Sequence, residues 1–462
     1  MKKYISIPNS TVRRTRVASF GSGMNTTLDE SILPIHTAKY IYNFNYSSGA
    51  LTKGYGLKKS NIGLTNVKSM WFYNRWDFDN NVSEQIPMYC DISGAVWFYR
   101  NGALKLLDGV KFTSPPIAVN YRLYGDDVIL MCSENENLKV WDGVNPPYSV
   151  PNSPFITSLT MHYERMFTTI GGERNAVWFS SDLDPTNWDL HLNRGGFIEV
   201  LDERGRLNKV LSYLNHIYIF RDYGISRLTA FAEQTDFAVS NLFVSSGKIY
   251  ADTALLCGDR VLFLASDGFY AFDGLSTVNI LKTLTNKIKP SPNANACYHD
   301  GKYFIALNLE LEDGETAVGK NDNNALVVFD IKSGAFSILT NVDISRMVSD
   351  GKEIFAILSD GAVCSIELCG SIFNKSTKKI WTSGFIDFNT EKQKTLREIH
   401  INNDSEITLQ VFSERQSKSF TVPANDGINR VRVNVRGKKL CVSIESNEIE
   451  PNITRPTVIF SS

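Results

Sequence analysis

The chain has 462 residues and a formal net charge of −1, and 43 % of its residues are hydrophobic and 21 % charged. This composition suits a folded protein with a large core, and the charge balance gives no general attraction to nucleic acid or to an anionic membrane. The seven cysteines are sparsely spaced without a Cys-x-x-Cys pair, so we expect reduced thiols in a reducing compartment. The longest apolar runs fall short of the ~20 residues of a membrane span, and Tyr4–Ile7 is too short for a signal peptide.

Residues 1–62 do not share the pattern of the chain that follows. They contain Gly21-Ser22-Gly23, then the apolar run Tyr40–Asn45 and a glycine-flanked Tyr55. We expect an extended N-terminal arm that ends in a strand, and this strand could pair with the last repeat of the next region.

From residue 63 to 370 the apolar residues come in runs of four to seven, rich in Val, Ile, Phe, Tyr and Leu and separated by Gly, Asp, Asn and Ser. That pattern predicts strands and turns, with faint helical character only at Phe231–Phe237 and Asn286–Lys289. Clear strands are expected at Ala95–Arg100, Val128–Cys132, Ala176–Ser180, His216–Arg221, Val261–Ala265, Tyr303–Leu307, Ala325–Asp330, Glu353–Leu358 and Ala362–Glu367.

The same unit recurs seven times in this region: a turn with Asp or Gly, an apolar strand, a polar break and a second apolar strand. The copies lie roughly 37 to 51 residues apart, which is the spacing of propeller blades. Because one four-stranded sheet cannot cover both its faces, stacking such sheets radially buries them. The sequence therefore predicts an all-β fold with a β-propeller of about seven blades at 63–370. A sandwich array or a β-solenoid is the alternative.

After Gly370 the sequence pattern changes. Ser371–Lys379 is a polar linker, and seven short strands are expected within the final part of the chain, which predicts a small antiparallel β-sandwich at 371–462. The expected strands are Ile380–Phe388, Thr395–Asn402, Glu406–Phe412, Lys418–Val422, Arg430–Val435, Lys439–Ser446 and Thr457–Phe460.

Motifs of catalysis are missing from the sequence. The six histidines lack the spacing of a zinc site, and there is no phosphate loop, dinucleotide fingerprint or Gly-x-Ser-x-Gly elbow. Nothing selects a pair of carboxylates for glycoside hydrolysis. We therefore expect no enzyme activity, no cofactor and no metal.

Two polar segments need a structural interpretation. Phe179–Leu190 departs from both a calcium loop and the Asp-box hairpin of sialidase propellers, and a turn capped by Asp182 and Asp184, with Trp188 packed on the blade, explains it better. Glu312–Asn324 is polar and contains Gly, so we expect a mobile surface loop.

Four stretches, taken in order, resemble a phage family: the propeller-containing packaged-DNA stabilisation or tail-accessory proteins of head-to-tail connectors. They are Ala38–Gly56, with its glycine-rich end; Met161–Trp188, with Val-Trp-Phe-Ser-Ser-Asp-Leu-Asp-Pro; Asn208–Leu228; and Trp381–Phe388 together with Arg430–Leu440. The resemblance implies a virion protein, made in the host cytoplasm, that forms a homo-oligomeric ring around the DNA exit channel. It also implies contacts with other tail or connector proteins and non-specific contact with packaged double-stranded DNA.

The aromatic content of 11 % suits subunit contacts, although aromatic residues also fill blade interfaces. The alternative function is a glycan-binding or glycan-cleaving propeller at the tail tip, with tryptophans at the propeller mouth stacking on sugars. The candidate interface residues for these functions are Trp71, Trp76, Trp141, Asp184, Trp188, Trp381 and Arg436.

Overall fold

The computed structural model describes residues 12–16, 20, 23–47, 49–60, 62–77, 80–172, 175–191, 194–201, 203–231, 234–311, 323–389 and 391–461. Its described residues form strands almost throughout, with two short 3₁₀ turns, η1 (Gln234–Asp236) and η2 (Lys282–Lys287), close to the segments with faint helical character. The loop expected at 312–324 lies outside the described residues except for Asn323 and Asn324.

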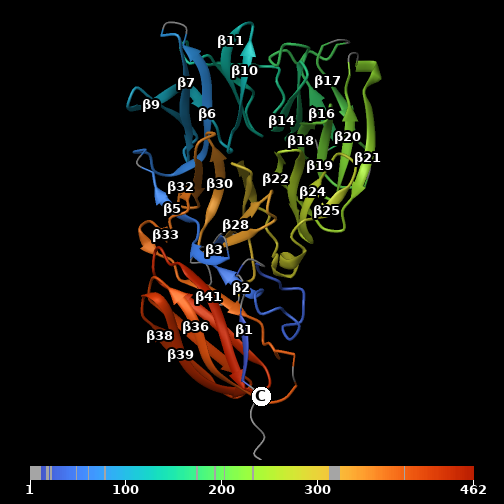
Figure 1. The fold of residues 1–462 in the computed structure, drawn as a ribbon. Helices are drawn as coiled ribbons and strands as arrows, with labels where there is room; N and C mark the ends of the chain where they lie inside the picture. The colour runs from blue at the N-terminus through green and yellow to red at the C-terminus, as the bar shows by residue number, and fades with distance from the viewer. Residues whose placement is uncertain are drawn as a thin grey trace, which may run out of the picture.

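Seven antiparallel sheets, here called blades 1 to 7, follow one another along the chain and form a β-propeller (Figure 1), which confirms the predicted fold class. Blade 1 consists of β6 (Val67–Asp77), β7 (Val82–Asp91), β8 (Ala95–Arg100) and β9 (Ala103–Lys111). Blade 2 consists of β10 (Ile117–Leu123), β11 (Asp126–Cys132), β12 (Lys139–Trp141) and β13 (Tyr148–Ser149). Blade 3 consists of β14 (Ile156–His162), β15 (Arg165–Ile170), β16 (Ala176–Phe179) and β17 (Gly196–Glu199).

The remaining blades repeat this order. Blade 4 consists of β18 (Leu207–Tyr213), β19 (His216–Arg221), β20 (Gly224–Thr229) and β21 (Ala238–Val244), and blade 5 of β22 (Ile249–Cys257), β23 (Arg260–Ala265), β24 (Gly268–Phe272) and β25 (Thr277–Asn279). Blade 6 consists of β26 (Asn295–His299), β27 (Lys302–Leu307), β28 (Ala325–Asp330) and β29 (Phe336–Thr340). Blade 7 contains β30 (Ile344–Ser349), β31 (Ile354–Leu358) and β32 (Val363–Glu367).

Hydrophobic packing between neighbouring blades explains why the sequence repeats. The second strand of most blades is buried on both faces, because it lies between two adjacent sheets. One hydrophobic cluster fills each of the seven blade interfaces, including the interface of blade 7 with blade 1, where Ile357 and Val363 pack against Val67, Met70 and Tyr89. The ring is therefore closed.

Polar ties at equivalent positions join the first strands of successive blades. Nδ1 of His162 lies 2.8 Å from Oγ of Ser212, and Nδ1 of His299 lies 2.9 Å from Oγ of Ser349. Burial lowers the pKa of His162 to about 4, so its imidazole is neutral at pH 7. The repeat thus extends from the strand order to individual hydrogen bonds.

The last blade is completed by a strand from the other end of the chain. β5 (Gly56–Lys59) pairs antiparallel with β32, so that Cys364 faces Lys59 and Glu367 faces Gly56. The hairpin of β33 (Ser371–Ile372) and β34 (Lys375–Ser376) adds to the same sheet. The segment expected as a polar linker is therefore partly built into blade 7.

The sandwich combines the two ends of the chain. One sheet has the order β3 (Phe44–Ser47), β4 (Ala50–Lys53), β41 (Ile453–Ser461), β36 (Lys394–Asn403) and β39 (Asn425–Gly437), with β1 (Val12–Arg16) paired to β41. The other has the order β2 (Ala38–Tyr42), β35 (Lys379–Ser383), β40 (Leu440–Ser446), β37 (Ile407–Ser413) and β38 (Ser417–Val422). The seven expected C-terminal strands are present. The segment expected as a separate arm contributes four more strands, β1 to β4, to the same sandwich.

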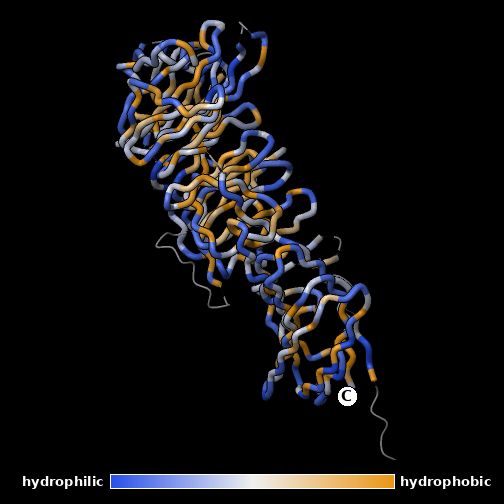
Figure 2. Tube along the Cα trace, turned by 90° about the vertical axis from the view of Figure 1, so that its left-hand side faces the viewer, coloured by the Kyte–Doolittle hydropathy of each residue, from blue (hydrophilic) through white to orange (hydrophobic). Residues whose placement is uncertain are grey.

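Propeller and sandwich share one core. A single cluster joins Leu264 of blade 5 and Tyr303 of blade 6 to Trp381 and Ile399 of the sandwich, and the ring of Phe20 lies edge-on to Trp381 at 5.1 Å. The sandwich extends from the side of blades 5 and 6, so the molecule is elongated, with blades 2 and 3 at the far end (Figures 1 and 2).

A buried lysine joins blade 7 to the sandwich. Lys379 is fully buried, and its ammonium donates hydrogen bonds to the carbonyls of Gly370 (2.9 Å), Thr377 (3.1 Å) and Glu448 (2.7 Å). Burial lowers the pKa of Lys379 to about 8, so the group is still mostly charged at pH 7.

We predict that Lys379→Met destabilises the protein by about 2–4 kcal/mol at pH 7, because the buried carbonyls of Gly370 and Thr377 and the partly buried carbonyl of Glu448 lose their donor. Urea unfolding measures the change. Lys378→Met is the matched control: Lys378 is partly exposed and makes an ion pair of 3.6 Å with Glu445, so its loss is expected to cost less than about 1 kcal/mol. Equal effects of the two substitutions would contradict the role given to Lys379.

Candidate functional site: the turn face of the propeller

Four of the seven candidate interface residues lie in the core. Trp71 and Trp141 fill the interface of blades 1 and 2, Trp188 that of blades 2 and 3, and Trp381 the sandwich, each at most 7 % exposed. These four therefore have the packing role that the sequence also allowed. The other three reach the surface: Trp76 is 40 % exposed, Arg436 is exposed on β39 and Asp184 is half-buried. They do not come together in one site.

The acidic segment before Trp188 is a capped turn. Oδ1 of Asp184 accepts a hydrogen bond from the backbone N–H of Thr186 at 2.9 Å, and the indole N–H of Trp188 donates to the carbonyl of Pro185 at 2.9 Å. Asp182 does not cap in the same way, and its carboxylate lies 3.8 Å from Nε of Arg165. Among the described residues no cluster of His, Cys, Asp and Glu could hold a metal ion.

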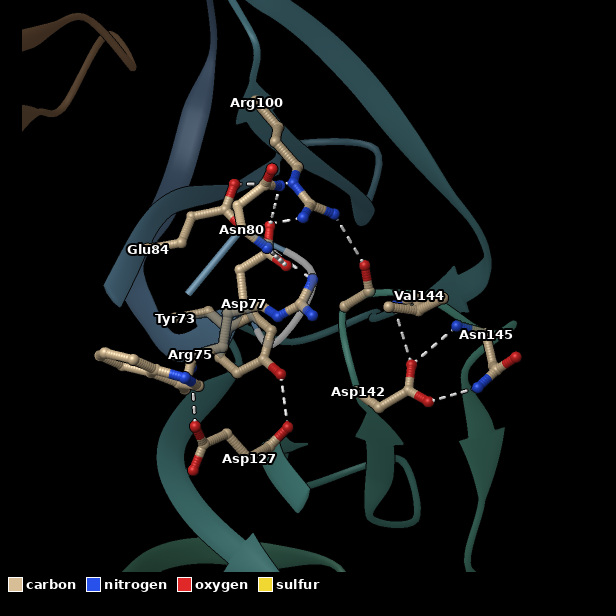
Figure 3. Close-up of polar contacts among 12 residues, drawn as sticks. Tyr73, Arg75, Asp77, Asn80, Glu84, Arg100, Asp127, Asp142, Val144 and Asn145 are labelled. Carbon is tan, nitrogen blue, oxygen red and sulfur yellow. Dashed lines mark hydrogen bonds and ion pairs between the residues drawn. The ribbon is translucent and has the colours of Figure 1, made fainter. Parts of the chain in front are cut away.

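Trp76 lines a hollow of about 540 Å³ between blades 1 and 2, the region drawn in Figure 3. The lining residues are Asn74, Arg75, Trp76, Ser83, Arg122 and Asp127. Oδ2 of Asp127 accepts a hydrogen bond from the backbone N–H of Trp76 at 2.8 Å, and the Tyr73 hydroxyl donates to the carbonyl of Asp127 at 2.6 Å. Burial raises the pKa of Tyr73, which keeps the phenol protonated as a donor.

Charged side chains next to this hollow form further polar contacts (Figure 3). The guanidinium of Arg100 makes a bidentate contact with Glu84 at 2.7 and 2.8 Å, and it also donates to the carbonyl of Gly143 at 3.0 Å. Nη1 of Arg75 lies 3.9 Å from the same glutamate. Among the described lining residues Asp127 is the one carboxylate, so the hollow can hold a polar ligand but lacks a pair of carboxylates.

The thiols give no sign of reactivity. All seven cysteines are free, and six of them are buried. Burial raises the pKa of Cys90, Cys257 and Cys364 to about 12, so they remain protonated at pH 7.

The turns between the first and second strands of the blades, here called the turn face, hold bulky residues in an unfavourable backbone conformation. In blades 2, 3 and 4 the first turn residue is Tyr124, Tyr163 or Leu214, with φ of 51°, 48° and 46°, whereas blade 5 has Gly258 at this position and blade 6 has Asp300. Left-handed backbone favours Gly, Asn and Asp, so large side chains here are strained. They are also 80 %, 59 % and 58 % exposed.

Hydrogen bonds and ring contacts connect two of these turns into one surface. Leu183, itself at φ 57° and 59 % exposed, donates its backbone N–H to the carbonyl of Glu164 at 2.8 Å, and its carbonyl lies 3.3 Å from the Tyr121 hydroxyl. The Tyr124 hydroxyl donates to Asp184 at 2.8 Å, and the ring of Tyr163 lies 5.9 Å from Phe231. We call the surface made by Tyr121, Tyr124, Tyr163, Leu183 and Phe231 the tyrosine face.

The tyrosine face has an acidic setting. Burial raises the pKa of the Tyr121 phenol, and the carboxylates of Asp184, Glu164 and Asp182 raise it further. This surface was not predicted from the sequence. The sequence feature that could have indicated it is a bulky residue at the turn position where other repeats of this chain carry Gly or Asp.

Comparisons with known proteins find only distant structural likenesses. No family model and no curated protein matches the chain. Among solved structures, a catalytically inactive virginiamycin B lyase from Staphylococcus aureus with quinupristin aligns at 9 % identity and TM-score 0.44, over 68 % of this chain and 99 % of that one. The C-terminal WD40 domain of Sif2 aligns at 13 % identity and TM-score 0.42, over 67 % and 97 %. PorZ of Porphyromonas gingivalis aligns at 11 % identity and TM-score 0.39, over 85 % and 46 %.

We predict that Tyr163→Asn and Leu214→Asn each stabilise the protein by roughly 0.5–1 kcal/mol, because Asn tolerates the left-handed backbone. Chemical unfolding of each variant measures the gain. Tyr148→Asn is the control: Tyr148 is 52 % exposed but lies in strand β13 without a positive φ, so no gain is expected. A loss of stability at both turn positions would show that these side chains hold the turns in place.

Proposed function

We propose that this chain is a structural virion protein of a bacteriophage tail or head-to-tail connector, which assembles into a ring around the DNA channel and performs no catalytic step. The observation that carries the proposal is the single core shared by propeller and sandwich. A ring subunit has to keep its contact surfaces in a fixed relation, and one continuous core holds both ends of this elongated molecule together.

The segments that resemble the connector family support the proposal by their positions. Ala38–Gly56 runs from β2 of the sandwich to the first residue of β5, the strand that completes blade 7. Met161–Trp188 and Asn208–Leu228 lie in blades 3 and 4, and the last two stretches lie in the sandwich. The net charge of −1 suits a channel wall along which DNA slides without being gripped. The described residues contain no helix long and apolar enough to cross a membrane.

The test is to look for the protein in purified particles and to determine its assembly state. We expect mass spectrometry to detect the chain in virions, and electron microscopy to place a ring at the portal or tail. The isolated protein, studied by light scattering over a range of concentrations, should form oligomers of defined mass. A strictly monomeric protein that is absent from purified particles would overturn the proposal.

A second candidate function has one observation in its favour. The hollow at Trp76 combines a partly exposed indole with Arg122, Asp127 and Asn74, the combination that binds carbohydrate by stacking on the sugar and hydrogen bonding to its hydroxyls. On this alternative the propeller is a tail-tip protein that binds a host glycan.

For this alternative we predict glycan binding that falls at least about fivefold in Trp76→Ala, since the packing of a sugar ring on an indole is expected to contribute about 1 kcal/mol or more. Glycan arrays followed by titration calorimetry measure it. Tyr99→Ala is the matched control, because Tyr99 is also 40 % exposed but does not line the hollow. No binding on the arrays, or equal loss in both variants, would exclude the hollow as a glycan site.

A further inference from the structure

The sandwich carries a line of arginines on the outer side of one sheet. The strand register places Glu398 between Arg432 on one neighbouring strand and Ile459 on the other, and Ile459 in turn lies opposite Arg14. Arg430 lies opposite His400, and Arg436 lies opposite Thr395. Val431, Val433 and Val435 alternate with these arginines along β39 and pack in or against the core cluster. Arg397 is exposed on β36 and directly precedes Glu398. We call Arg14, Arg397, Arg430, Arg432 and Arg436 the arginine stripe.

The arginine stripe is strongly positive. Glu398 is the carboxylate within its rows; its pKa is lowered by a hydrogen bond from His400 and by the nearby charges of Arg432 and Arg430. Arg430, Arg432 and Arg436 are exposed, and β39 is the edge strand of its sheet. Guanidinium groups on such an edge can pair with carboxylates and stack on aromatic rings.

The tyrosine face offers the complementary chemistry. It presents exposed phenol rings and aliphatic groups close to the carboxylates of Glu164, Asp182 and Asp184. Tyrosine and arginine are among the side chains that are enriched where proteins bind one another. Backbone strain is often found at functional sites, and Tyr124, Tyr163 and Leu183 combine a positive φ with a large exposed side chain.

The two surfaces cannot meet within one molecule. The tyrosine face belongs to blades 2 to 4, whereas the sandwich extends from blades 5 and 6 at the other end of the elongated chain (Figure 1). A contact between two different surfaces of identical subunits is heterologous, and it produces a ring when the rotation between neighbours closes.

We infer that the tyrosine face of one copy binds the arginine stripe of the next copy, so that the subunits join head to tail. This inference rests on the proposed ring function and names the two surfaces that would build the ring. The occupant of the tyrosine face is thus a second copy of this chain, selected by opposite charge and by the placement of the two surfaces at opposite ends.

Charge reversal tests the inference, with the association constant measured by analytical ultracentrifugation. Glu164→Arg and Arg432→Glu, each alone, should weaken self-association at least about tenfold, while the double variant, with both charges exchanged, should recover most of it. A mixture of the two single variants should form oligomers in which the two variants alternate, since every contact between unlike variants then pairs one arginine with one glutamate. Lys352→Glu, a reversal at an exposed turn of blade 7, should associate like the wild type.

A cross-link locates the contact independently. Tyr163→Cys combined with Arg432→Cys should give disulfide-linked oligomers under mild oxidation, whereas either single variant should give little product because six of the native thiols are buried. A wild-type oligomer that is unaffected by both single reversals would overturn this inference and leave the proposed ring intact. A wild-type protein that stays monomeric would overturn this inference, and its absence from purified particles as well would overturn the proposed ring. Loss of double-stranded DNA binding in Arg432→Glu, with unchanged self-association, would assign the stripe to DNA instead.

Discussion

The pairing of β5 with β32 is the interaction on which the rest of the architecture depends. Without it, blade 7 would have an open edge, and the small cluster between blades 7 and 1 would be the weakest point of the ring. Because β5 comes from the start of the chain, the segment before it has to lie next to blade 7. That segment, β1 to β4, then completes the sandwich formed by the last part of the chain. The same N-terminal segment therefore both closes the ring and completes the sandwich.

The fold class was accessible from the sequence because its signals are local. Short apolar runs and two-residue turns mark strands wherever they occur, and the repeat of about forty residues indicates blades. The position of the N-terminal strands was not accessible in this way. Ala38–Tyr42 pairs with Lys379–Ser383 across more than three hundred residues, and nothing in either run specifies its partner. The segment expected as an arm is for this reason an integral part of two sheets.

The candidate residues show where sequence reasoning about sites reaches its limit. A tryptophan at a predicted propeller mouth looks the same whether its ring points into the neighbouring blade, as in Trp141, or into solvent, as in Trp76. Strand register decides between them, and one residue of shift reverses the outcome. Tyr124 and Tyr163 did not stand out because tyrosine is common in strands, and the sign of their φ becomes known only with the backbone.

The propeller is inserted between the two halves of the sandwich, and this has a consequence for synthesis. Chains emerge from the ribosome N-terminus first, and domains tend to fold as they appear. The blades can pack progressively, but β1, β4 and β36 pair with β41, whose residues 453–461 are synthesised after all the blades. A chain that stops early would thus have most of its blades and no finished second domain. Only molecules translated through residue 461 would offer the guanidinium-bearing sheet in its final form, so incomplete chains would be kept out of any assembly that requires it.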